Sequence, residues 1–330
     1  MYLKIIVLAD KKGDYMSFSS KTKNELARAI PEKDCCKYSE LAALIRMSGT
    51  LQLVGLEKFN LVITTENASV ARKIFKLFKK LFGINIEVMI RKNLKLKKNN
   101  HYLMVVTHTM NSWEVLSKVG ILKQFDDTFD ITYEIPKDLI KTRCCKRAYL
   151  RGAFLGGGSV SDPEKTYHLE FVTNSVEHSK DLKKLVNSFK LSSKIVERKG
   201  NYVVYLKEGD QIVDLLNIIE AHQALLDLEN IRVYKQMRND INRIVNCETA
   251  NLSKTVNASM KQVENIIYIK ETVGLNFLPD NLREVAKLRL NYQDASLKEL
   301  GLMLTPPIGK SGVNHRLRKI EEVARDIKKT

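Results

Sequence analysis

An internal repeat constrains the fold of this chain more than any other feature of its sequence. One copy, from Cys35, reads CCKYSELAALIRMSGTL, and the other, from Cys144, reads CCKRAYLRGAFLGGGSV. In both copies, apolar and small residues lead into a glycine, which a hydroxyl residue and a branched apolar residue follow. The repeat predicts two equivalent helices that open two equivalent halves.

The segments that follow the two copies also correspond. Alternating apolar residues predict strands that begin near Phe59 and Tyr167, because a period of two places every second side chain on one face. A helical segment, a pair of strands and a closing helix come next in each half. Each half is thus predicted as helix, strand, helix, strand, strand, helix, and a further strand directly after the opening helix stays open. Two such halves predict a pseudo-twofold α+β domain over residues 16–223.

Small residues lie on one face of each opening helix. Gly152 and Gly156 are four residues apart with Ala153 beside them, and the first copy presents Ala42 and Ala43. Because small side chains allow two helix backbones to approach closely, we expect the two opening helices to pack against each other. An ordinary amphipathic core helix is the alternative for either copy alone.

The two copies resemble degenerate LAGLIDADG motifs, and the duplicated unit resembles a homing-endonuclease domain in a single chain. The resemblance implies that the paired helices form the interface and that acids at their ends hold divalent metal for DNA cleavage. The first acidic position of the motif falls on Arg46 and Leu155, and the second falls on Ser48 and Gly157. Since Mg²⁺ requires carboxylate oxygens, we expect no catalytic residue, no metal and no cofactor here.

The charge of the chain indicates a polyanionic partner. Lys and Arg number 55 against 38 Asp and Glu, which gives a net charge of +17. Nucleic acid is the commonest polyanion, and a generally basic soluble protein is the alternative. The sequence contains neither the roughly 18-residue apolar stretch that spans a bilayer nor a signal-peptide pattern. Its five cysteines are an odd number, which argues against a secreted disulfide framework and for a cytoplasmic protein. With DNA as the expected partner, we also expect the protein to be nucleoid-associated.

A basic loop separates the last two strands of the first half. Five cations without an acid occupy it, namely Arg91, Lys92, Lys95, Lys97 and Lys98. We interpret the loop as a hairpin arm that contacts DNA phosphates, and a solvated loop is the alternative.

Adjacent cysteines precede both opening helices, Cys35–Cys36 in one half and Cys144–Cys145 in the other. Their equivalent positions predict that the two pairs lie near each other. Structural zinc sites space their cysteines as C-x₂₋₄-C, which adjacent residues do not match. Thiols that pack as small apolar residues are therefore favoured over a metal site.

The segment from about Leu226 is predicted to be entirely helical. Its polar central part includes Arg243 and Lys254. These residues indicate a second phosphate-contacting surface, and a hydrated connecting helix is the alternative.

Two helices near the C-terminus predict a helix-turn-helix. Asp280 or Asn281 is expected to cap the helix before them. The first, SLKELGLML, has Ser296 and Glu299 in capping-box spacing and an apolar stripe of Leu297, Leu300, Met303 and Leu304. Pro306 and Pro307 end this helix, since neither fits its interior.

The last predicted helix, KSGVNHRLRKIEEVARDI, divides into two faces. Its apolar face contains Val313, Leu317, Ile320, Ala324 and Ile327. The opposite side and its flanks supply the predicted DNA-binding residues, which are Lys310, Ser311, Asn314, His315, Arg316, Arg318 and Lys319. A three-helix bundle without DNA contacts is the alternative.

The C-terminal part resembles region 4 of sigma factors. Joined to the degenerate LAGLIDADG-like domain through NRIVNCETANLSKT, it is similar to the WhiA family of bacterial regulators. The resemblance covers residues 16–330 and leaves residues 1–15 as an N-terminal extension. We therefore expect a LAGLIDADG-like domain over 16–223, with repeats at 35–126 and 144–223, and a helical linker and helix-turn-helix domain over 224–330.

The combined features predict a non-enzymatic protein that binds double-stranded DNA. The resemblance implies a transcriptional regulator involved in sporulation, cell division or chromosome segregation, with another transcription or cell-division protein as a candidate partner of the N-terminal domain. We expect no membrane association and no small-molecule substrate. One alternative is a metal-dependent endonuclease that uses Asp162 and Glu164, the acids nearest the second motif. The other is an N-terminal domain that binds protein alone.

Overall fold

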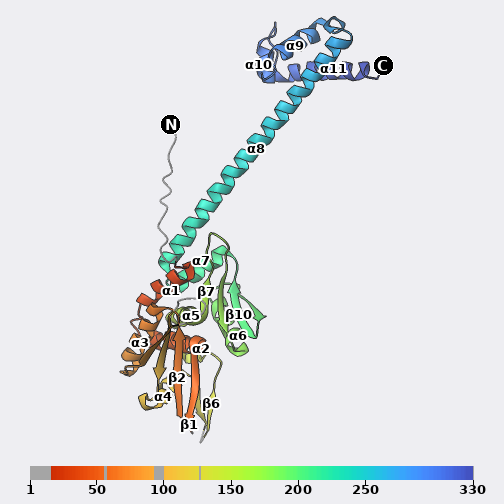
Figure 1. The fold of residues 1–330 in the computed structure, drawn as a ribbon. Helices are drawn as coiled ribbons and strands as arrows, with labels where there is room; N and C mark the ends of the chain where they lie inside the picture. The colour runs from red at the N-terminus through yellow and green to blue at the C-terminus, as the bar shows by residue number, and fades with distance from the viewer. Residues whose placement is uncertain (1–15, 56–57, 93–99, 126–127, 330) are drawn as a thin grey trace. The chain divides into compact units, whose positions relative to one another are not determined.

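The computed structural model describes residues 16–55, 58–92, 100–125 and 128–329 (Figure 1). The chain forms two compact units, one up to Tyr234 and one from Lys235, and the division lies within the long helix α8 (His222–Thr272). Each unit has its own hydrophobic core. Among the described residues, no helix has the length and apolar character needed to cross a membrane. The predicted extension over residues 1–15 lies outside the described residues.

The first unit contains the predicted duplication. The first repeat consists of α2 (Asp34–Ser48), β1 (Gly49–Gly55), β2 (Lys58–Thr65), α3 (Ala68–Phe82), β3 (Glu87–Lys92), β4 (Asn100–Val106) and α4 (Ser112–Lys118). The second consists of α5 (Arg143–Gly157), β7 (Gly158–Val160), β8 (Leu169–Thr173), α6 (Val176–Asn187), β9 (Lys194–Arg198), β10 (Asn201–Leu206) and α7 (Gly209–Ile218). The strand that the sequence left open is present in both repeats, as β1 and β7.

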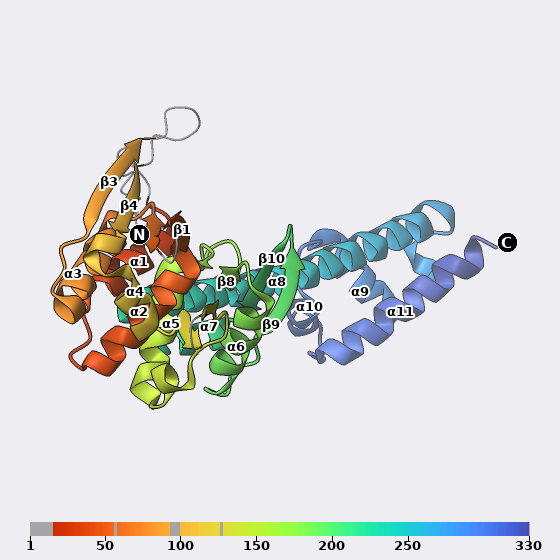
Figure 2. The same ribbon diagram turned by 90° about the horizontal axis from the view of Figure 1, so that it is seen from below.

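The two repeats have the same sheet topology. Their antiparallel sheets have the orders β1-β2-β4-β3 and β7-β8-β10-β9. The alternating residues of the central strands point into the core, where Leu61 and Ile63 of β2 and Leu169 and Phe171 of β8 are buried. Figure 2 shows the first repeat, in red to yellow, beside the green second repeat, and helices α2 and α5 pack against each other where the repeats meet. The predicted α+β duplication is confirmed.

Several elements of the first unit are additional to those predicted for the two repeats. Helix α1 (Phe18–Arg28) precedes the first repeat, and the side chain of Ser17 caps it by accepting from the backbone N–H of Ser20. The hairpin of β5 (Leu122–Phe125) and β6 (Thr128–Ile131) lies between the repeats. Short 3₁₀ turns lie at η1 (His108–Met110) and η2 (Lys137–Ile140).

The second unit is helical. After α8 it contains η3 (Leu275–Phe277), α9 (Asp280–Asn291), α10 (Leu297–Leu302) and α11 (Lys310–Ile327). Its core joins Ile266 and Ile269 of α8 to apolar residues of α9, α10 and α11. The expected side-chain cap at Asp280 or Asn281 is wrong, because Pro279 is the N-cap and Asp280 already lies inside the helix. Met303 is exposed, whereas Leu300 and Leu304 of the same predicted stripe are buried.

Candidate nucleic-acid interface

Helices α10 and α11 form a compact helix-turn-helix. The predicted capping box fixes the start of α10, with Ser296 N donating to Glu299 Oε2 at 2.7 Å and Glu299 N donating to Ser296 Oγ at 3.3 Å. In the turn, Ile308 N donates to the carbonyl oxygen of Gly301 at 3.0 Å. A Cβ on Gly301 would overlap the carbonyl oxygen of Ile308 and lie 3.2 Å from Val313 Cγ2. Glycine at position 301 therefore permits the close approach of α10 to the turn and to α11.

Helix α11 presents two distinct faces, as its sequence predicts. Val313, Leu317, Ile320 and Ala324 are buried in the core of the second unit, and Ile327 is partly buried against it. This apolar face fixes the rotation of α11 on α8 and α9. The opposite side is therefore held toward solvent.

Most of the predicted DNA-binding residues lie on the solvent side of α11. Ser311, His315 and Arg318 follow one another at helical spacing and are exposed, with Lys310 and Lys319 exposed beside them. Asn314 is half-buried. Arg316 is also half-buried and points back toward α9, where its guanidinium donates to the carbonyl oxygen of Asn281 at 3.4 Å.

The other predicted phosphate contacts lie on two separate elements. Arg91 is exposed near the end of β3, and Lys92 is the last residue of that strand. Lys95, Lys97 and Lys98 lie outside the described residues. Arg243 and Lys254 are exposed on α8, and Arg243 lies 3.8 Å from the carboxylate of Asp240.

In the first unit, the four motif positions that are acidic in endonucleases have structural contacts. The guanidinium of Arg46 donates to the carbonyl oxygens of Thr132, at 2.5 Å, and Gly120, at 2.6 Å. Ser48 Oγ donates to the carbonyl oxygen of Leu44 at 2.8 Å, and Leu155 is buried. Arg46 thereby ties α2 to the segments that flank the β5–β6 hairpin.

Position 157 leaves no room for an acid. A Cβ on Gly157 would lie 2.5 Å from Met47 Cε and 2.8 Å from the carbonyl oxygen of Val172, which belongs to strand β8. An aspartate there requires a shift of this strand. Asp162 instead closes a turn, in which its carboxylate accepts from Glu164 N at 3.0 Å. Among the described residues, the groups of three or more candidate ligands contain cysteines and no cluster of carboxylates.

A buried network of ion pairs links the two repeats, and the sequence reasoning missed it. Glu40 of α2 is completely buried and accepts from Arg151 Nε of α5 at 3.0 Å and from Lys73 Nζ of α3 at 2.5 Å. Arg151 also contacts Glu220 at 2.5 Å. Desolvation lowers the pKa of Lys73, and Glu40 opposes this by stabilising the charged form. In the sequence, Glu40 and Arg151 are charged residues among the apolar and small residues of the two motif helices. This contrast is the signal from which their burial could have been predicted.

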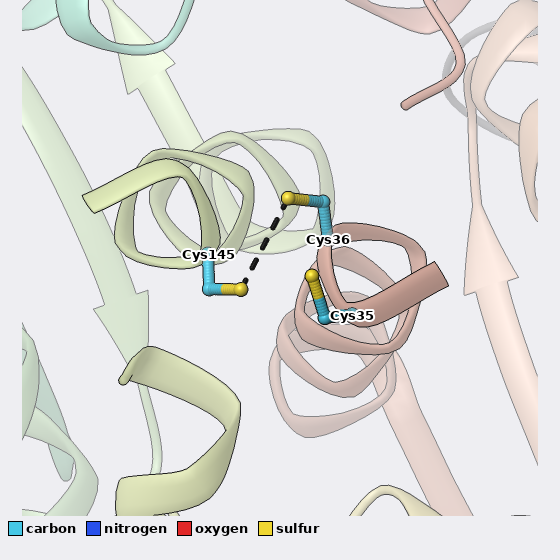
Figure 3. Close-up of side chains that lie close together, drawn as sticks. All are labelled: Cys35, Cys36 and Cys145. Carbon is cyan, nitrogen blue, oxygen red and sulfur yellow. Dashed lines mark hydrogen bonds between the residues drawn. The ribbon is translucent and has the colours of Figure 1, made fainter. Parts of the chain in front are cut away.

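The paired cysteines meet at the start of α2 and α5, as their equivalent positions predict. Cys36 and Cys145 are buried with their sulfurs 4.0 Å apart, and the sulfur of Cys35 lies within 4.8 Å of both (Figure 3). The packing prediction is correct for Cys36 and Cys145. It is wrong for Cys35 and Cys144, which are exposed.

Comparisons with known proteins agree with this architecture. Residues 34–122, 146–238 and 241–324 match family models described as the WhiA N-terminal LAGLIDADG-like domain, the WhiA LAGLIDADG-like domain and the WhiA C-terminal HTH domain. The probable cell division protein WhiA of Alkaliphilus metalliredigens is 70% identical over 94% of this chain and 98% of its own length. That of Thermoanaerobacter sp. (strain X514) is 63% identical, over 95% of this chain and 98% of its own length.

A solved structure is similar over nearly the whole chain. The crystal structure of full-length DUF199/WhiA from Thermatoga maritima matches with a TM-score of 0.58 and 26% identity, over 94% of this chain and 99% of that chain. The chain belongs to the WhiA family, with two LAGLIDADG-like domains followed by a C-terminal helix-turn-helix domain.

Proposed function

We propose that this protein is a non-enzymatic, double-stranded-DNA-binding protein that acts in cell division. The exposure of Arg318 and Lys319 on α11 is the main support for this proposal. Both side chains lie on the solvent side of the helix, and its apolar side is buried in the core of the second unit. Relatives at 63–70% identity are named probable cell division proteins, and residues 241–324 match an HTH family model.

The geometry of α11 suggests how it reads DNA. The N-terminal part of a recognition helix enters the major groove, where an arginine fork matches the acceptors of guanine. We assign this base contact to Arg318, with Ser311, Asn314 and His315 beside it. Lys310 and Lys319 contact phosphates at the flanks. Arg316 faces α9, so we do not assign a base contact to it. Its proposed role is packing against α9 or a contact with a DNA phosphate.

The proposal includes finer roles for the rest of the chain. The cations between β3 and β4 and those of α8 supply further phosphate contacts. The proposed domains are the LAGLIDADG-like domain over 16–223 and the linker and helix-turn-helix domain over 224–330. We further propose that the protein is cytoplasmic and nucleoid-associated, and that it regulates transcription in sporulation, cell division or chromosome segregation. A transcription or cell-division protein is the proposed partner of the LAGLIDADG-like domain.

The absence of nuclease activity rests on the motif positions. Arg46, Ser48, Leu155 and Gly157 provide no carboxylate, and Gly157 has no space for one. Incubation of supercoiled plasmid with the full chain and Mg²⁺ is expected to leave it intact. Nicking that disappears in an Asp162→Asn variant would support the endonuclease alternative.

Salt-dependent binding tests the DNA-binding proposal. The logarithm of the binding constant falls linearly with the logarithm of the salt concentration, by about 0.9 for each phosphate contacted in duplex DNA. Replacing both Lys310 and Lys319 with glutamine is expected to reduce the slope by about 2. The matched control, in which Lys328 and Lys329 are both replaced with glutamine, is expected to leave the slope unchanged. Equal slopes for the parent and both variants would show that α11 does not contact DNA phosphates.

A further inference from the structure

We propose that Cys35, Cys36, Cys144 and Cys145 form a binding site for a thiophilic divalent cation, Zn²⁺, at the junction of the two repeats. The cysteines come in two equivalent pairs from the first turns of α2 and α5. Figure 3 shows Cys35 and Cys36 on one helix facing Cys145 on the other. The sulfurs of these three residues all lie within 4.8 Å of one another.

The spacing of the sulfurs fits metal coordination better than a disulfide. Tetrahedral zinc with Zn–S bonds of about 2.3 Å separates its sulfur ligands by about 3.8 Å. The sulfurs of Cys36 and Cys145 are 4.0 Å apart, close to this value. A disulfide would require them at about 2.05 Å.

In this geometry, adjacent cysteines on two facing helices can serve as ligands of one metal ion. Within a single short loop, C-x₂₋₄-C spacing is what allows two thiolates to reach one metal. Here each helix contributes a pair, and the pseudo-twofold arrangement directs the pairs toward each other. The sulfur of Cys35 consequently lies near both Cys36 and Cys145, although Cys35 itself is exposed.

Cys144 completes the set of four ligands. Its thiol comes from the first turn of α5, beside Cys145, and lies 3.1 Å from the hydroxyl of Thr142, outside the group of three sulfurs that lie within 4.8 Å of one another. Zn²⁺ binds the thiolate form of cysteine, so binding at this site would release the protons of the thiols.

The surroundings suit a site rich in negative charge. Four thiolates around Zn²⁺ leave an excess of two negative charges, which the N-termini of α2 and α5 offset through their dipoles. No side chain caps α2, so its first N–H groups remain directed at this end. Arg151 and Lys33 add positive charge near Cys36 and Cys144. A bound cation would thus join the two repeats at the end of their interface.

Metal titration of the full chain tests the site. The protein is reduced, stripped with a chelator and titrated with Zn²⁺, and then with Cd²⁺ to observe the ultraviolet charge-transfer band of cadmium thiolates. We expect a single Zn²⁺ per chain and the same stoichiometry for the band. The Cys247→Ser variant, which removes an exposed cysteine on α8, is the matched control and should behave like the parent.

Substitution of the exposed ligands avoids damage to the core. Cys35→Ser and Cys144→Ser should each weaken Zn²⁺ binding by more than about tenfold, which is what the loss of a residue that only supports a ligand typically costs. The circular dichroism spectrum of both variants should be unchanged. Absence of stoichiometric Zn²⁺ and of the cadmium band in the reduced parent would overturn the proposal. Equal affinity of the parent and both serine variants would overturn it as well.

Discussion

Ala43 and Gly152 occupy equivalent positions in the two repeats and lie directly opposite each other across the α2–α5 interface. A Cβ on Gly152 would overlap the carbonyl oxygen of Glu40 and lie 2.9 Å from the Cβ of Ala43. One turn further, a Cβ on Gly156 would lie 2.7 Å from the Cβ of Met47, again its equivalent residue. The two backbones are so close that glycine is required on one side, and this contact holds the repeats together.

Gly152→Ala should destabilise the first unit. The added methyl group meets the backbone of α2, which cannot rotate away, and overpacking of this kind costs about 1–3 kcal/mol. Urea unfolding followed by circular dichroism measures the change. Gly55→Ala is the control, because a Cβ there lies in ordinary contact, 3.6 Å from the side chain of Lys58. A loss no larger than that of the control would show that the helices are not held this closely.

Glu40→Gln should cost more than any exposed ion pair. The change leaves Lys73 and Arg151 buried without the carboxylate between them, and breaking a buried pair from one side costs about 3–5 kcal/mol. The control is Asp34→Asn, which removes an exposed partner of Lys37 and is expected to cost less than about 1 kcal/mol. Similar unfolding free energies for the two variants would contradict the proposed role of the network.

His178 should make the first unit less stable in acid. Burial, and secondarily the charge of Arg46, lowers its pKa to about 3, and its ring contacts Tyr149 Oη and Thr173 Oγ1 at 3.0 and 3.2 Å. The unfolded chain binds the proton from about pH 6.5 downward, and the folded chain does so only near pH 3. The free energy of unfolding is therefore unaffected by His178 above about pH 6.5. Below that pH, protonation of His178 in the unfolded chain lowers it by about 1.4 kcal/mol per pH unit.

Comparison of the parent with His178→Gln isolates this contribution. The parent should lose about 2 kcal/mol more than the variant between about pH 7 and pH 5. Urea unfolding at both pH values measures the difference, and the exposed His108→Gln variant should follow the parent. Parallel losses in the parent and His178→Gln would mean that His178 is protonated in the folded chain.

Local patterns were sufficient to predict most of the secondary structure. The alternation in β2 and β8 and the capping box at Ser296 depend on neighbouring residues, and each was predicted correctly. The small residues of the paired helices also revealed their interface, because their equivalence repeats along the chain. The buried and solvent-facing sides of α11 were predicted from the same kind of periodicity.

Contacts between distant residues were not predictable in this way. Glu40 and Arg151 are 111 residues apart, and no local rule pairs them. The β5–β6 hairpin lies between the repeats and therefore has no second copy for comparison. Asp280 failed as a cap because Pro279 precedes it and occupies the N-cap position. Tertiary geometry decides the pairing of Glu40 with Arg151, whereas the position of the cap depends on the local backbone at Pro279.

Base recognition by α11 is tested most directly by the effect of Arg318→Ala on sequence preference. Binding of the full chain is measured on a genomic fragment that it prefers and on random duplex DNA, at a fixed salt concentration. We expect Arg318→Ala to lose about 1–3 kcal/mol of binding free energy on the preferred fragment and less on random DNA, so that the preference declines. Arg325→Ala, on the same helix beyond the proposed contacts, should retain the preference. An unchanged ratio of the two affinities in Arg318→Ala would contradict base recognition by α11.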